Sequence, residues 1–174
     1  MQNRTLRQLT AAGVIAAAYA ALSLVLAPIT FGPVQCRISE ALTLLPVISP
    51  AAIWGVTLGC AVTNGVGAAT GANFLGLLDI LVGTAATLLA AVLTRLLGKC
   101  RFGGLPWLSA LPPILINAVA IGGEWCYAMT GSINGAFWVF AGQIALGQLP
   151  PCLLGVWLVG LLERRSLQTI IEGK

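Results

Sequence analysis

The polar residues best suited to recognise a ligand are few, and their densest group lies between two apolar runs. The turn signal Gly32-Pro33 comes first, and Gln35, Arg37 and Glu40 follow it. Proline cannot continue a helix from upstream, so a polar connection is predicted here. Arg37 and Glu40 are three residues apart, so on a helix they would share a face and pair. The pattern is typical either of a charge-paired helix start or of a lid over a ligand at a membrane surface.

Further residues of this kind stand apart from one another in apolar surroundings. They are Asn64, Asp79, Asn117, Glu124, Trp125 and Gln143. Carboxylates and side-chain amides accept hydrogen bonds from ring N–H groups, and the face of Trp125 can stack on a flat molecule. Among all these candidate residues, the acidic side chains of Glu40, Asp79 and Glu124 outnumber the one basic side chain, Arg37. This balance favours a neutral or cationic ligand.

The composition decides what kind of protein carries these residues. The chain has 174 residues, of which 58% are hydrophobic and 8% are charged. Soluble domains carry about 25% charged residues, so this chain cannot cover a water-exposed surface. A membrane span needs about 20 apolar residues, which allows about six helices. We therefore predict an all-α multi-span membrane protein that forms one domain over residues 1–174.

Several classes of function are excluded or disfavoured by what the sequence lacks. It contains no histidine, which excludes Ser-His-Asp, Cys-His and HExxH catalysis. It has no phosphate-binding loop of the G-x-x-x-x-G-K-[ST] type, so any ATP that powers it binds to another chain. The five cysteines lie far apart, which makes a zinc site improbable, and no cofactor is predicted. The net charge of +4 comes without an aromatic-interleaved basic patch, so nucleic-acid binding is not expected.

Apolar runs predict the helices. They cover residues 11–29, 38–49, 51–66, 75–97, 107–127 and 137–162. The first run is longer than the 7–15 apolar residues of a signal peptide, so we expect it to be retained. The run 38–49 is short for a span, because at about 1.5 Å per residue it covers about 18 Å of a roughly 30 Å core. Starting that helix at Pro33, which suits a first turn, would lengthen it.

The distribution of basic residues predicts how these helices cross the membrane. With six crossings, all basic residues except Arg37 fall on one side of the membrane. The basic residues on that side are Arg4, Arg7, Arg95, Lys99, Arg101, Arg164, Arg165 and Lys174. Basic residues collect in cytoplasmic segments, so both termini are expected in the cytoplasm. The short segment 38–49 must then traverse a thinned or tilted region.

This topology predicts that polar side chains from several helices share one layer near the outer surface. The layer contains Glu40, Asn64, Asp79, Glu124 and Gln143, with Asn117 two turns deeper. Taken singly, each is explained as a helix cap or an interfacial side chain. Together they favour a pocket that opens outward, because ionisable groups inside a membrane usually line a pathway or a binding site.

Small residues recur at steps of four in the first helix. One row holds Ala12, Ala16 and Ala20, and the adjacent row holds Ala17 and Ala21. Such rows let another helix approach closely. The partner is either another helix of the same bundle or a separate membrane subunit.

The residues described so far resemble those of a known family. The stretch 31–42, FGPVQCRISEAL, followed by Leu45-Pro46, resembles the QueT family of substrate-binding S components of energy-coupling-factor (ECF) transporters. Leu78-Asp79-Ile80 and the segment 83–91 are also similar, as is Asn64. The similarity covers nearly the whole chain, although the fifth and sixth helices match only loosely.

The resemblance implies a six-helix S-component bundle in a bacterial plasma membrane, with a pocket closed by the loop after the first helix. It implies a transmembrane scaffold subunit and two cytoplasmic ATPases as partners, docked on the small-residue face. The implied ligand is a queuosine precursor, either queuine or a related 7-deazaguanine base. Other hypotheses are an S component for a vitamin, a stand-alone channel or carrier, a membrane enzyme and a purely structural membrane protein.

Overall fold

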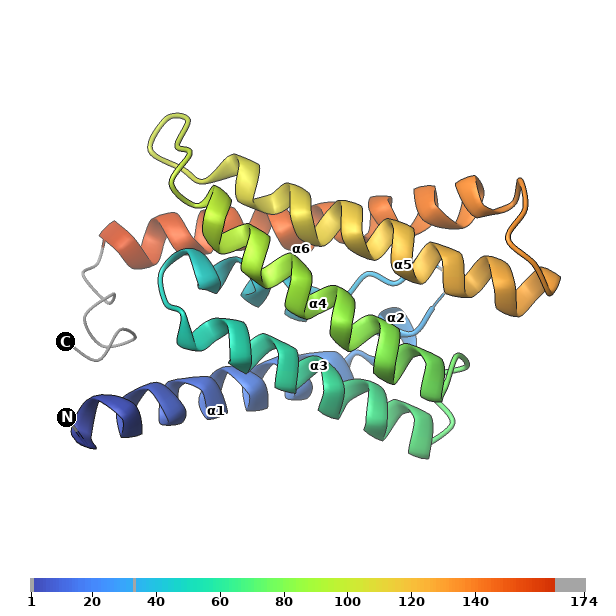
Figure 1. Ribbon diagram of the computed structural model, residues 1–174, viewed down its shortest axis with the longest axis horizontal. Coiled ribbons are helices and arrows are strands. Elements are labelled where there is room, and N and C mark those ends of the chain that lie inside the picture. Colours follow the sequence, from blue (N-terminus) through green and yellow to red (C-terminus); the bar gives the residue numbers. More distant parts are fainter. Residues whose placement is uncertain (1, 33, 165–174) are drawn as a thin grey trace.

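The computed structural model describes residues 2–32 and 34–164, so the predictions that involve Pro33, Arg165 and Lys174 lie outside the described residues. The described chain is built from helices joined by short connections (Figure 1). The elements are α1 (Gln2–Val25), α2 (Ala27–Thr30), η1 (Ile38–Val47), α3 (Ala51–Ala69), α4 (Leu77–Leu97), η2 (Trp107–Ala110), α5 (Leu111–Thr130) and α6 (Phe137–Arg164).

Five helices are long and apolar enough to cross a membrane: α1, α3, α4, α5 preceded by η2, and α6. The prediction of an all-α multi-pass membrane protein is therefore confirmed. The remaining predicted span differs from expectation, because η1 is a 3₁₀ helix of 10 residues rather than an α-helix. A 3₁₀ helix rises about 2.0 Å per residue, so η1 reaches about 20 Å. Pro46 inside it has no N–H to donate to an α-helical ladder.

The long helices and η1 alternate in direction along the bundle, as Figure 1 shows. α1 begins and α6 ends at the same end of the molecule, which we call the basic end. It also contains the end of α4 and the loop after it. Its described basic residues are Arg4, Arg7, Arg95, Lys99, Arg101 and Arg164.

One ion pair ties the loop at the basic end to the last helix. Arg101 donates two hydrogen bonds to the Glu163 carboxylate, at 2.6 and 2.8 Å. These hydrogen bonds raise the pKa of the Arg101 guanidinium. The pair is partly exposed, so its contribution to stability is small.

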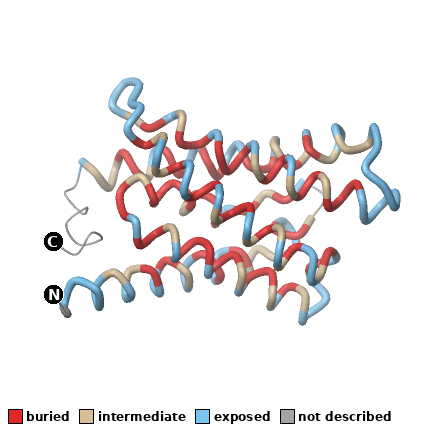
Figure 2. Tube along the Cα trace, in the orientation of Figure 1, coloured by how far each residue is buried: buried red, intermediate tan, exposed pale blue. Residues whose placement is uncertain are grey.

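The core surrounds η1, which lies in the middle of the bundle against α1, α3, α4 and α6. Figure 2 shows buried positions concentrated on the inward sides of the helices. Leu44 of η1, Val56 of α3 and Val156 of α6 are fully buried in one hydrophobic cluster. Gly155 permits this packing, because a Cβ there would lie 2.5 Å from the Ala41 carbonyl oxygen. Packing against these four helices, which buries most of its residues, stabilises the unusually long 3₁₀ segment.

The small-residue rows of α1 are divided between the interior and the surface. Ala12 and Ala20 are buried, and α1 packs closely on α3. At Gly59 of α3, an added Cβ would lie 2.9 Å from the Ala16 carbonyl oxygen. The row 12, 16 and 20 therefore faces α3 within the bundle, and docking of a separate subunit on α1 stays a prediction. Ala17 and Ala21 are exposed.

Candidate functional site

Polar side chains from five elements gather at the end of the bundle opposite the basic end. Asp79 lies in the first turn of α4, and Asn64 lies in the last two turns of α3. Glu124 and Gln143 each lie six positions from the nearby ends of α5 and α6, which is about 9 Å along a helix. Glu40 lies in the first turn of η1. We call these residues, together with Arg37, the polar cluster.

Asp79 is the centre of the cluster's hydrogen bonding. The Nη2 atom of Arg37 lies 3.1 Å from Asp79 Oδ2, and both side chains are almost fully buried. Asn73 donates a 2.8 Å hydrogen bond to the same carboxylate oxygen. Asn64 donates a 2.8 Å hydrogen bond to the backbone carbonyl of Asp79. A buried charge needs such partners to offset its lost hydration, so this arrangement holds Asp79 in place.

Gly83, one turn further along α4, leaves room for this arrangement. A Cβ at position 83 would lie 2.5 Å from Asp79 Oδ1 and 2.8 Å from Asn64 Nδ2. Any larger residue would displace one of these two groups. The glycine that the sequence places four positions after Asp79 therefore has a steric role in the cluster.

Glu40 is held by a residue from the first helix. The hydroxyl of Tyr19 donates a 2.6 Å hydrogen bond to Glu40 Oε1, and both residues are buried. Sequence reasoning missed Tyr19, because it lies within an apolar run and its partner is far away in the chain. It also missed Asn73, whose contact with Asp79 depends on how the loop between α3 and α4 folds.

The described residues between α2 and η1 contact two helices beside the cluster. The Phe31 ring lies against Gly67 of α3, and the Arg37 guanidinium carbon lies 5.5 Å from the centre of that ring. On the other side, the Val34 carbonyl packs against Gly147 of α6, where a side chain would collide with it. Gln35 is buried and takes a left-handed backbone conformation with φ of 45°. We call residues 31, 32 and 34–37 the strap.

An aromatic group lies beside Glu124. Trp125 is buried among Leu75, Ile121 and Ile144. Its ring centre is 6.1 Å from that of Phe74 and 6.3 Å from that of Phe140. These separations are typical of interacting aromatic pairs. The arrangement forms an apolar group that joins α5 and α6 to the residues just before α4.

Many buried polar atoms of the cluster have no hydrogen-bond partner among the described residues. They are Arg37 Nε, Glu40 Oε2, Asn64 Oδ1, Asp79 Oδ1, Glu124 Oε1 and Oε2, and Gln143 Oε1. The Nε1 atom of Trp125, next to Glu124 in the chain, also lacks a described partner. Each such atom costs about 1–3 kcal/mol of lost hydration. Native proteins keep few of them, so a concentration in one place indicates a site where polar groups of a ligand or water are bound.

The structure thus brings together most of the residues predicted to bind a ligand. The exceptions are Gln35, which is buried within the strap, and Asn117, which is buried further along α5. Asn117 lies 13 positions before Thr130, where α5 ends, which is about 20 Å. It is therefore the deepest of the predicted site residues.

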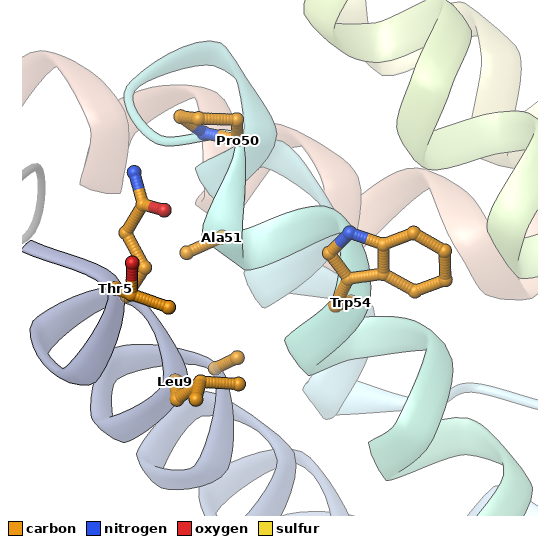
Figure 3. Close-up of a pocket in the computed structure, with 7 residues that line it drawn as sticks. Thr5, Leu9, Pro50, Ala51 and Trp54 are labelled. Atoms are coloured by element: carbon orange, nitrogen blue, oxygen red, sulfur yellow. The ribbon is translucent and has the colours of Figure 1, made fainter. Parts of the chain in front are cut away.

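A separate hollow lies at the basic end, between the starts of α1 and α3 (Figure 3). Its volume is about 260 Å³, and its lining includes Thr5, Leu9, Pro50 and Trp54. The lining is mostly apolar, and none of the polar-cluster residues contributes to it. This hollow is distinct from the polar cluster.

The fold and the cluster define the class of protein: an all-helical, multi-pass membrane protein with polar groups buried at one end of its bundle. The chain belongs to the QueT transporter family, whose model matches residues 9–164. This confirms the resemblance seen in the sequence and makes the chain a member of a transporter family rather than an enzyme family. No curated protein and no solved structure matches the chain.

Proposed function

We propose that this protein is the substrate-binding S component of an ECF-type importer and that its polar cluster captures a queuosine precursor. The observation that carries the proposal is the set of buried, unpaired polar atoms contributed by separate helices at one end of the bundle. Membership of the QueT transporter family supports it. The ligand would be queuine or a related 7-deazaguanine base.

The chemistry of the cluster suits such a ligand. A deazaguanine ring is flat and presents several N–H donors. Asp79 Oδ1 and Asn64 Oδ1 are acceptors without a partner among the described residues, and both fit this donor pattern. Trp125, with the rings of Phe74 and Phe140 near it, is the proposed aromatic contact for the ligand ring.

The proposed orientation places the basic end in the cytoplasm of a bacterial cell and the cluster toward the outside. The chain would then cross the plasma membrane six times, with η1 as the short crossing. Its length of about 20 Å is less than the roughly 30 Å hydrocarbon core. The difference would be accommodated either by local thinning of the bilayer or by the helices that surround η1.

The strap is the proposed lid over the ligand. It contacts α3 through Phe31 and α6 through Val34, and it contributes Arg37 to the pair with Asp79. Movement of the strap would therefore break a buried ion pair as it opens the cluster. A ligand that adds hydrogen bonds to Asp79 while the strap is in place would favour the closed position of the strap.

Energy for transport would come from partner subunits, namely a transmembrane scaffold and two cytoplasmic ATPases. The sequence contains no phosphate-binding loop of its own. The exposed Ala17 and Ala21 of α1 remain the proposed contact for the scaffold, because small residues allow close helix approach in a membrane.

Calorimetry tests the proposal on the isolated protein in lipid nanodiscs. Queuine should bind the wild-type protein with measurable heat, whereas vitamins from a competition panel should not displace it. Absence of binding by any deazaguanine would contradict the proposed substrate. Displacement of queuine by one vitamin would indicate that this vitamin is the substrate. Uptake into vesicles that contain this protein without any ATPase would contradict the proposed S-component role.

A further inference from the structure

The three acidic residues of the polar cluster differ in how they are paired. Asp79 pairs with Arg37 at 3.1 Å and accepts a hydrogen bond from Asn73. Glu40 accepts a hydrogen bond from Tyr19. Glu124 has neither kind of support, because both of its carboxylate oxygens lack a partner among the described residues.

Glu124 is nevertheless buried, with 8% of its surface exposed. Arg37 is committed elsewhere: its Nη2 contacts Asp79, and its guanidinium lies over the Phe31 ring. The ion pairs within residues 2–32 and 34–164 are Arg37–Asp79 and Arg101–Glu163, so no described cation pairs with Glu124.

An uncompensated acid in a buried site is costly unless a partner joins it. The residue next to Glu124 in the chain, Trp125, is aromatic, and the rings of Phe74 and Phe140 lie near it at the same end of the bundle. Aromatic faces attract organic cations when water is excluded. A ligand that carries a cationic substituent on a flat ring would therefore suit an unpaired acid in aromatic surroundings.

We infer that Glu124 is the counter-ion for a positively charged group of the ligand, so that the site selects cationic over neutral forms of the same ring. The inference rests on the proposed ligand site and adds a specificity-determining residue to it. In this assignment the Arg37–Asp79 pair holds the strap and contacts the ring of the ligand. Glu124 recognises the positive charge of the ligand.

Two probes that differ mainly in charge test this assignment by calorimetry in nanodiscs. One is a 7-deazaguanine with an aminomethyl group, which is cationic at pH 7, and the other carries a neutral nitrile at the same position. The wild-type protein should bind the cationic probe more tightly. Glu124→Gln should weaken binding of the cationic probe at least about tenfold, or about 1.4 kcal/mol, and should change binding of the nitrile probe less than about threefold.

Glu124→Asp is the matched control, because it keeps the charge and should retain preference for the cationic probe. An equal loss for both probes in Glu124→Gln, or no loss for either, would overturn the assignment. If neither probe binds the wild-type protein, the proposed function fails, and benzamidine and neutral benzamide become the probes in a thermal-shift measurement. Stabilisation by benzamidine alone that disappears in Glu124→Gln would support the counter-ion role, and its absence would overturn it.

Discussion

The two sides of the polar cluster are built from similar residues but are stabilised differently. On the side of α3 and α4, Asp79 has three polar contacts, from Arg37, Asn73 and Asn64. On the side of α5 and α6, Glu124 lacks a described hydrogen-bond partner for either carboxylate oxygen, and Gln143 lacks one for its carbonyl oxygen. The first side holds the Arg37 end of the strap through a buried ion pair, whereas no described cation pairs with Glu124 on the second side. The comparison separates an acid that the protein's own residues hold from an acid that they leave unpaired.

Removal of the charge of Asp79 should give the largest loss of stability. Asp79→Asn leaves Arg37 buried without its counter-charge, and breaking a buried pair in this way costs about 3–5 kcal/mol. Denaturant unfolding of the purified protein measures this loss. The double variant Arg37→Met/Asp79→Leu should recover much of it. A single variant as stable as the wild type would contradict the structural role of the pair.

Gly83→Ala should have the next largest effect, because the new methyl group would lie 2.5 Å from Asp79 Oδ1. Overpacking of this kind costs about 1–3 kcal/mol, measured as a lower unfolding temperature. Gly65→Ala is the matched control, since nothing lies within 4 Å of a Cβ there, and it should be neutral or stabilising. Equal responses of the two variants would show that space beside Asp79 is not limiting.

Tyr19→Phe should have a smaller effect on stability. It removes the hydroxyl that donates to Glu40 and leaves a buried carboxyl group with one fewer partner, which costs about 1–3 kcal/mol. The aromatic ring and its packing against Gly59 are retained. Thermal unfolding provides the measurement, and an unchanged midpoint would mean that Glu40 finds another partner.

Glu124→Gln should have the smallest effect on folding, although it affects the proposed ligand most. No described hydrogen bond or ion pair is lost, and a buried charge is replaced by a neutral amide. The unfolding free energy should stay the same or rise slightly. A loss as large as that of Asp79→Asn would remove the distinction between the two sides of the cluster.

Much of this architecture was predictable from the sequence. Long apolar runs predicted the five membrane-length helices, and isolated polar residues such as Asp79 and Glu124 predicted a layer of polar side chains near one end of the bundle. The 3₁₀ conformation of η1 was not predictable, because it depends on burial by neighbouring helices. The burial of Ala12 against α3 was also unresolved, since a row of small residues fits an internal or an external partner equally well.

The pairing pattern within the cluster was beyond sequence reasoning for a similar reason. The hydrogen bond between Tyr19 and Glu40 and the ion pair between Arg37 and Asp79 join distant parts of the chain. Single-sequence patterns carry side-chain type and spacing, but they do not show which of several acids has a partner.

A density map of the protein with queuine bound tests the central claim most directly. The account predicts ligand density beneath the strap, in contact with Asp79 and Glu124 and against the face of Trp125. Ligand density in the hollow between Thr5 and Trp54 at the basic end, with the polar cluster unchanged, would contradict it.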